Sequence, residues 1–187
     1  TIDMIVAALG GEGGGVLTNW LIDVAKRSGW YCQSTSLAGV AQRTGATIYY
    51  LEFIPRSKNQ PEPVMSLFPA QGDIDIAVTS EIAEAGRMIS RGFISPERTT
   101  LISSDHRVYG ITEKSATADG TADTAFILDL SARYANRFVH FDLLELVQRH
   151  GTVISAGLFG AIAGAGVLPF QRDVFTEVLA VGKGAAA

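Results

Sequence analysis

The sequence predicts a three-layer α/β/α fold, in which helices cover both faces of a mainly parallel, Rossmann-like sheet. Three observations support this prediction. Short apolar runs alternate with segments of helical period along the chain. The first run, residues 2–9, is apolar at almost every position, as in a strand buried on both faces of a parallel sheet. The 187 residues, 47% of them hydrophobic, suffice for one complete core, so we expect residues 1–187 to form a single domain.

The first half of the chain predicts one helix and three strands, the strands at residues 2–9, 30–36 and 47–54. Apolar residues fall on one stripe of residues 15–28, which predicts a helix that Gly29 ends. The third strand is rich in β-branched and aromatic residues and is closed by Pro55. Three prolines in residues 56–72 then predict a surface excursion.

The second half continues the alternation, with strands at residues 73–80, 98–104 and 136–142 and helices at residues 81–93, 120–135 and 142–151. Ser80 is a candidate N-cap for the first of these helices. Residues 107–114 predict a further strand or an edge element.

Residues 155–182 predict two C-terminal helices that separate near residues 166–169. Pro169 can occupy an early position of the second helix. The first helix is small and apolar on nearly all sides, so we expect it to be buried partly inside the domain and partly against a partner subunit.

The composition argues against several classes of protein. The net charge is −4 and the few lysines and arginines are scattered, which argues against nucleic-acid binding. No apolar run is long enough to span a membrane and no signal-peptide pattern is present, so we expect no membrane association and a cytoplasmic location. The chain does not begin with Met and ends in "VGKGAAA", from which we expect a piece of a longer polypeptide.

Five glycines lie between Gly10 and Gly15, interrupted only by Glu12, directly after the first strand. Such a turn suggests a phosphate site, but its spacing does not match G-x-G-x-x-G, and no carboxylate follows the second strand. The lysine of a P-loop is absent, and Glu12 would repel a pyrophosphate. We therefore favour a turn whose glycines permit close approach to other parts of the chain.

A second glycine-punctuated loop, Ser36–Gly45, follows the second strand and contains several polar residues. Both loops are predicted at the carboxyl ends of strands, so we expect them to be neighbours at the edge where α/β sheets bind ligands. Arg43 can bind a carboxylate or a phosphate through its planar fork, or can bond to local carbonyls as a surface arginine. The spacing alone does not decide between these roles. The candidate ligand or interface residues are Gly10, Gly11, Glu12, Gly13, Ser36, Gly39, Gln42, Arg43, Thr44 and Gly45.

No catalytic set and no metal site emerge from the remaining residues. The three histidines, His106, His140 and His150, lie far apart without metal-ligand spacing, so we interpret each as structural or exposed. Cys32, the only cysteine, excludes an iron–sulfur cluster held by this chain alone and is interpreted as a small buried residue. Glu81 and Glu84 begin a helix, which suits the helix dipole without a catalytic role.

The stretches "AALGGEGGGV" and "GVAQRTGATIYYLE" resemble the gamma-type domain of the 2-oxoacid:ferredoxin oxidoreductases, above all the indolepyruvate ferredoxin oxidoreductase beta subunit. The family's G-x-G-G-Q-G-V turn maps onto residues 8–13, and its G-x-x-x-R-G-G signature maps onto residues 39–45. Further similar stretches extend the resemblance over nearly the whole chain. Three positions depart from the family pattern, with Ala8 at the first glycine, Glu12 at the glutamine and Thr44 at the glycine after the arginine.

The resemblance implies a component of an enzyme that decarboxylates an arylpyruvate with thiamine diphosphate, reduces ferredoxin through iron–sulfur clusters and forms an acyl-coenzyme A. Thiamine diphosphate and the clusters would belong to a partner subunit or domain, and this chain would bind neither alone. It would pack on that partner and help to shape the active-site or coenzyme A region, with Arg43 facing an anionic ligand or a partner carboxylate.

Two other functions stay open from the sequence. A free-standing module could bind NAD, FAD or ATP, or act as a regulatory module, without partner subunits. A scaffold subunit would contact no ligand. A thermal shift with nucleotides separates the first alternative from the oxidoreductase component, for which little or no shift is expected.

Overall fold

The computed structural model describes residues 1–37, 46–57, 61, 63–108 and 123–181. They form a six-stranded sheet with the strand order β2-β3-β1-β4-β5-β6. The strands are β1 (Ile2–Leu9), β2 (Trp30–Leu37), β3 (Ala46–Pro55), β4 (Ile76–Thr79), β5 (Thr100–Ser104) and β6 (Arg137–Phe141). The helices are α1 (Gly14–Arg27), α2 (Ile82–Ser90), α4 (Thr124–Tyr134), α5 (Leu143–Arg149), α6 (Ile154–Ala165) and α7 (Arg172–Val181).

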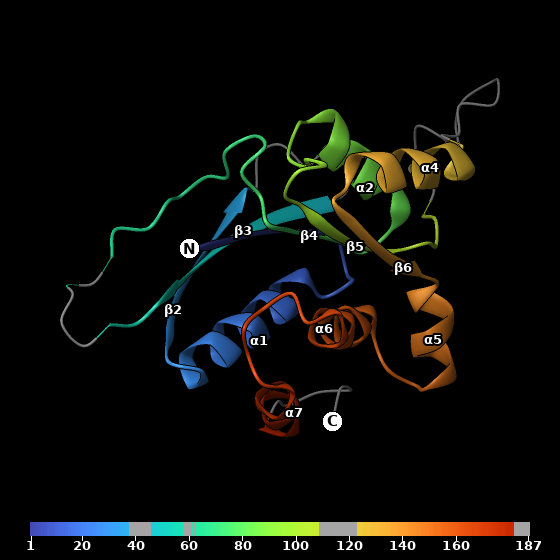
Figure 1. Cartoon of the computed structure of the whole chain (residues 1–187). Helices are drawn as coiled ribbons and strands as arrows, with labels where there is room; N and C mark the ends of the chain where they lie inside the picture. The colour runs from blue at the N-terminus through green and yellow to red at the C-terminus, as the bar shows by residue number, and fades with distance from the viewer. Residues whose placement is uncertain (38–45, 58–60, 62, 109–122, 182–187) are drawn as a thin grey trace.

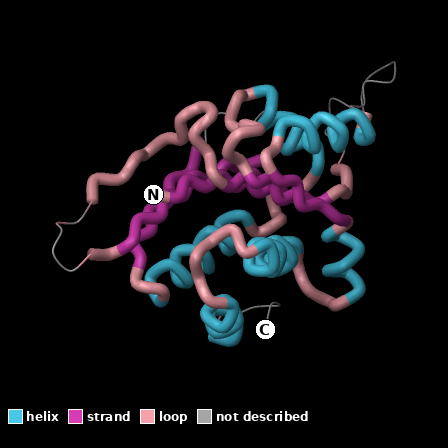
Figure 2. Tube along the Cα trace, in the orientation of Figure 1, coloured by secondary structure: helices cyan, strands magenta, loops and turns pink. Residues whose placement is uncertain are grey.

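Helices cover both faces of the sheet, as the sequence predicts (Figure 1, Figure 2). On one face α1, α5, α6 and α7 bury a core that includes Met4, Leu21 and Phe159. On the other face α2 and α4 cover a second core that includes Ile5, Met88 and Ile127. The continuous apolar run of β1 contributes to both cores, because successive side chains of a strand point to opposite faces.

The sheet is mainly parallel but mixed. β1, β4, β5 and β6 run parallel to one another, whereas β3 lies antiparallel between β1 and β2. Only residues 38–45 separate β2 from β3 in the chain. A parallel connection needs a dozen or more residues, so strands this close in the chain pair antiparallel. Leu9 at the end of β1 pairs with Ala46 at the start of β3, and Ser36 of β2 pairs with Tyr49. β1 and β2 therefore run in the same direction, and their carboxyl ends lie at the same end of the sheet.

Several local predictions need correction. Ser80 is not the N-cap of α2, because Glu81 holds that position and the Ser80 hydroxyl bonds elsewhere. Pro169 lies outside α7, which begins at Arg172. The ladder of β4 covers only Ile76–Thr79 of the predicted residues 73–80. Of the predicted strand or edge element at residues 107–114, the structure describes only Arg107 and Val108, and neither is in a strand.

The first C-terminal helix, α6, is buried on one side and open on the other. Leu158, Phe159 and Ile162 face the core, whereas Gly160 and Gly164 are exposed. The expectation that this helix is partly buried inside the domain is confirmed. Its contact with a partner subunit stays a prediction.

Candidate functional site

The glycine turn joins the carboxyl end of β1 to the first turn of α1. Gly11 and Gly13 adopt the left-handed conformation, with φ of 87° and 77°, which residues other than glycine rarely adopt. The backbone N–H of Glu12 donates to the Leu9 carbonyl at 3.1 Å and closes the turn. The two glycines thus allow the chain to reverse within a few residues and to place Glu12 between them.

The neighbouring Gly14 lies where no side chain would fit. A Cβ atom at this position would lie 2.7 Å from the Cβ of Ala8 and 2.7 Å from Cε2 of Tyr49. At Gly13 it would lie 2.7 Å from Oγ of Ser155 on α6. The absence of side chains therefore lets α1 approach β1, β3 and α6 closely.

Glu12 points into the edge of the sheet. Its Oε2 accepts a hydrogen bond from the Ser80 hydroxyl, and Ser80 Oγ accepts one from the Leu9 N–H at 3.1 Å. The other carboxylate oxygen, Oε1, lies 3.3 Å from Nε2 of His106. Ser80 is fully buried and His106 is only 8% exposed. The carboxylate thus connects the turn after β1 with residues that follow β4 and β5.

The hydrogen bonds extend from His106 to the start of α5. Nδ1 of His106 lies 2.7 Å from Oγ of Ser104, which accepts the Leu143 N–H at 3.0 Å. Because Nε2 faces a carboxylate, this pattern assigns the proton of a neutral His106 to Nε2 and makes Nδ1 the acceptor of the Ser104 hydroxyl. Each group then has a partner. Serine, histidine and glutamate follow one another as in a catalytic triad, but Ser104 is fully buried, so the arrangement is structural.

Glu12 and Ser80 occupy the topological switch point of the sheet. The helix after β1 covers one face and the helix after β4 covers the other (Figure 1), and open α/β sheets bind ligands where the chain diverges in this way. Here the Glu12 carboxylate fills the space between the two strand ends. A dinucleotide phosphate placed between these strand ends would meet that negative charge.

A cavity of about 490 Å³ lies on the outer side of the glycine turn. Its lining residues are Ala8, Leu9, Gly10, Gly11, Gly13, Gly14, Gly15, Val16, Asn19, Thr47 and Tyr49. Val16 is 48% exposed there, and Gly10 and Gly11 are also exposed. The described ends of the second predicted loop lie at this edge, because Ala46 pairs with Leu9.

The structure brings part of the predicted site together. Glu12 and the glycines share the turn after β1, but the Glu12 side chain points into the sheet, whereas Gly10 and Gly11 are exposed. Ser36 is exposed at the end of β2, which runs parallel to β1. The predicted residues Gly39, Gln42, Arg43, Thr44 and Gly45 lie outside the described residues. The expectation that the two loops are neighbours stays a prediction for these five positions.

The sequence matches the family described as pyruvate ferredoxin/flavodoxin oxidoreductase over residues 3–183. The chain belongs to this family. As a member, it is a component of a 2-oxoacid:ferredoxin oxidoreductase. No curated protein sequence matches the chain.

Two solved structures share the fold of this oxidoreductase component. One is the gamma subunit of a keto/oxoacid ferredoxin oxidoreductase from Geobacter sulfurreducens PCA, with a TM-score of 0.60 and 12% identity over 97% of this chain and 87% of that one. The other is pyruvate oxidoreductase subunit PORC from Thermotoga maritima, with a TM-score of 0.53 and 14% identity over 95% of this chain and 90% of that one. At these identities the likeness shows the fold alone.

The oxidoreductase component also contains buried charges that the sequence did not reveal. Glu81 and Glu84 are each 1% exposed, although the sequence suggested only a favourable helix start. Nη1 of Arg107 lies 3.4 Å from Oε2 of Glu81, and Arg87 pairs with Glu84. Burial raises the pKa of Glu84, and the nearby Arg87 opposes that rise. The Arg107–Glu81 pair joins the segment after β5 to the start of α2, whereas the Arg87–Glu84 pair lies within α2.

Cys32 and His140, two further candidates from the sequence, have contacts that indicate structural roles. Cys32 lies in β2, partly buried, and burial raises the pKa of its thiol to about 12. Nδ1 of His140 lies 2.9 Å from Asp105, and its ring stacks on Phe138. Within the described residues, no group of three His, Cys, Asp or Glu side chains could hold a metal ion. No helix in the same residues is long and apolar enough to cross a membrane.

Proposed function

We propose that this chain is the subunit of a thiamine diphosphate-dependent 2-oxoacid:ferredoxin oxidoreductase that binds neither thiamine diphosphate nor an iron–sulfur cluster. The edge formed by the glycine turn contacts the subunit or domain that holds these cofactors. The holoenzyme oxidatively decarboxylates a 2-oxo acid to an acyl-coenzyme A and reduces ferredoxin. The observation that carries this proposal is the family match over residues 3–183.

The chain's own residues do not fit an iron–sulfur cluster. Clusters are held mainly by several thiolates, and Cys32 is the only cysteine of the chain. A thiol whose pKa is raised to about 12 is protonated at neutral pH and is a poor metal ligand. The electron carriers of the enzyme then belong to a partner subunit or domain, which agrees with a supporting role for these residues.

The surface formed by Gly10, Gly11 and Val16, which we call the glycine edge, has the properties of a contact surface. Exposed Gly10 and Gly11 present backbone without side chains, and Val16 offers an exposed apolar group beside them. The first turn of α1 contains no acidic residue, and its N-cap Gly13 has no side chain to bond its free N–H groups. Because a helix N-terminus carries partial positive charge, this edge favours a negatively charged group opposite it.

Arg43 adds a positive charge to the segment that follows β2. We propose that it faces either a phosphate of an anionic ligand such as coenzyme A or a carboxylate of the partner subunit. We do not expect Glu12 to be the carboxylate that Arg43 binds, because both of its oxygens already have partners in Ser80 and His106. The arylpyruvate preference, with indolepyruvate as the substrate, rests on the sequence resemblance. The cytoplasmic location stays an expectation from the sequence pattern.

Arg43→Ala in the full complex tests this function. We expect weaker assembly if Arg43 meets a partner carboxylate, and a higher KM for coenzyme A if it meets a phosphate. Unchanged assembly, turnover and substrate affinity would overturn the role of Arg43.

The purified chain tests the rival function. Adding NAD, FAD or ATP to it should leave its thermal unfolding unchanged, because Glu12 fills the switch point. A large, saturable shift would instead support a free-standing nucleotide-binding module.

A further inference from the structure

The strand β6 is the last strand at one side of the sheet, and no described strand lies on its outer side (Figure 1). The N–H of Arg137 donates to the Thr99 carbonyl at 3.4 Å, and the Phe141 carbonyl accepts from Asp105 at 3.1 Å. Backbone groups of successive strand residues point to opposite sides. The N–H and C=O groups of Phe138 and His140 therefore point away from the sheet, and within the described residues no strand pairs with them.

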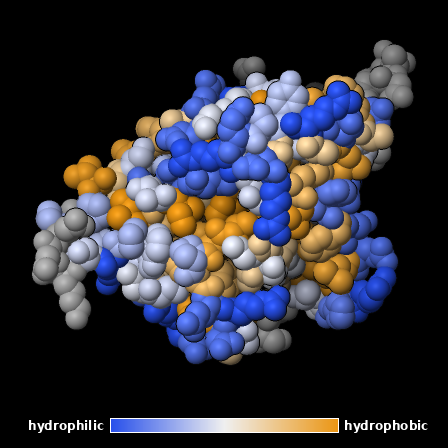
Figure 3. Space-filling model, in the orientation of Figure 1, coloured by the Kyte–Doolittle hydropathy of each residue, from blue (hydrophilic) through white to orange (hydrophobic). Residues whose placement is uncertain are grey.

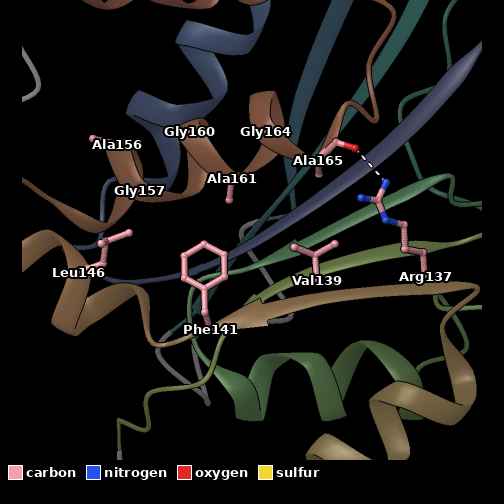
Figure 4. Close-up of a pocket in the computed structure, with 10 residues that line it drawn as sticks. All are labelled: Arg137, Val139, Phe141, Leu146, Ala156, Gly157, Gly160, Ala161, Gly164 and Ala165. Atoms are coloured by element: carbon pink, nitrogen blue, oxygen red, sulfur yellow. Dashed lines mark hydrogen bonds between the residues drawn. The ribbon is translucent and has the colours of Figure 1, made fainter.

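An apolar groove of about 450 Å³ lies beside this edge, between β6, α5 and α6 (Figure 4). The side chains of Val139 and Phe141 project from β6 toward α6, and Leu146 closes one end. Phe141 is 37% exposed and Leu146 is 39% exposed. The space-filling view shows hydrophobic residues across the middle of this face of the molecule, between the two helical layers (Figure 3). An open strand edge next to an apolar surface favours pairing with another chain.

We propose that β6 is an interface with a second copy of this chain, in which the two β6 strands pair antiparallel about a two-fold axis at Val139. The register follows from the outward groups. With Val139 opposite Val139 of the second copy, Phe138 of each chain lies opposite His140 of the other. Both outward residues of both chains then exchange hydrogen bonds, which yields four bonds between the copies.

The side chains of the strand suit this register. On the groove side, Val139 meets its own copy. The Arg137 guanidinium, whose Nη1 donates to the Ala165 carbonyl of its own chain at 2.8 Å, lies opposite the exposed Phe141 ring of the second copy, with which it forms a favourable cation–aromatic pair. On the opposite side, the stack of Phe138 on His140, with ring centroids 4.3 Å apart, is continued across the axis.

The charges at the two ends of β6 also favour the antiparallel arrangement. Arg137 begins the strand, and exposed Asp142 follows it. Antiparallel pairing places the basic end of each strand beside the acidic end of the other, whereas parallel pairing would place like charges together. This interface is independent of the glycine edge and goes beyond the proposed function.

A charge exchange at Val139 tests the interface in the full chain by analytical ultracentrifugation and native mass spectrometry. The wild-type chain is expected to be a dimer of twice 19.9 kDa. Val139→Lys and Val139→Glu each place like charges directly across the axis, so each variant alone should be monomeric. Mixing the two variants should restore a dimer that contains one chain of each kind.

Circular dichroism checks the folding of both variants. If neither variant folds, amide hydrogen exchange of the wild-type chain tests the interface instead. The amides of Phe138 and His140 should exchange more slowly in concentrated than in dilute protein, because the dimer protects them. Three results would overturn the proposal: a monomeric wild-type chain, a dimer that Val139→Lys leaves intact, or exchange at both amides that does not depend on concentration. A monomeric chain whose Val139→Lys variant fails to bind another subunit would assign the edge to that subunit instead.

Discussion

Nε2 of His106 lies 3.3 Å from Oε1 of Glu12, although 94 residues separate them in the chain. Together with the bond from Ser80, this contact turns the Glu12 carboxylate into the sheet and away from the outer cavity. Glu12 therefore holds the glycine turn against the strand ends instead of contacting a ligand. The position where the resembling family has Gln is thus a structural anchor in this chain.

Replacing Glu12 by Gln should lower the free energy of unfolding by about 1–3 kcal/mol. A glutamine offers one acceptor oxygen to two donors, the Ser80 hydroxyl and the His106 Nε2–H, so one buried donor loses its partner. Urea unfolding followed by circular dichroism measures the change. Glu177→Gln, at an exposed position of α7, is the matched control, and equal stability of the two variants would contradict the anchoring role of Glu12.

Gly14 and Gly160 are both helical glycines, but they should respond oppositely to alanine. At Gly14 the new methyl group would meet Ala8 and Tyr49 at 2.7 Å, and we expect a destabilisation of about 1–3 kcal/mol from overpacking. At Gly160 nothing lies within 4 Å of the new atom, and a gain of up to about 1 kcal/mol is expected. Thermal unfolding of both variants checks the difference, and a Gly14→Ala variant as stable as wild type would refute the close approach.

Cys32 should make the stability of the chain sensitive to alkaline pH. Burial raises its pKa to about 12, whereas an unfolded cysteine has a pKa of about 8.5. Stability from this group is complete below the unfolded value and is lost as pH rises toward the folded value, by up to about 1.4 kcal/mol per pH unit. Urea unfolding from neutral pH to about pH 10 should therefore show a smaller loss for Cys32→Ala than for wild type. Identical pH profiles would rule out the buried thiol as a cause.

The sequence predicts most of the fold because its signals are local. The apolar run of β1, the striped helix ended by Gly29 and the alternation of elements each depend on neighbouring residues, and all are found in the structure. The antiparallel insertion of β3 was not predicted. Strand order depends on contacts between distant parts of the chain, although the short connection of residues 38–45 between β2 and β3 was a usable signal.

The candidate site was only partly predictable for the same reason. The glycine turn is visible as a pattern, but His106 and Ser104 lie nowhere near Glu12 in the chain, so the sequence could not assign them to it. Ser80 was interpreted as a helix cap because serine before a helix usually is one. Its hydroxyl instead bonds to Glu12, a partner that only the parallel arrangement of β1 and β4 brings within reach.

The most direct test of the proposed function is whether the glycine edge meets the cofactor-bearing subunit. Val16→Lys places a charge on that edge, and Phe126→Lys places one at a 61% exposed position of α4 on the other helical layer. Co-purification of each variant with the remaining subunits measures assembly. We predict binding about tenfold weaker or worse for Val16→Lys, a loss of about 1.4 kcal/mol or more, and unchanged binding for Phe126→Lys. Wild-type assembly of the Val16→Lys variant would contradict the proposed contact.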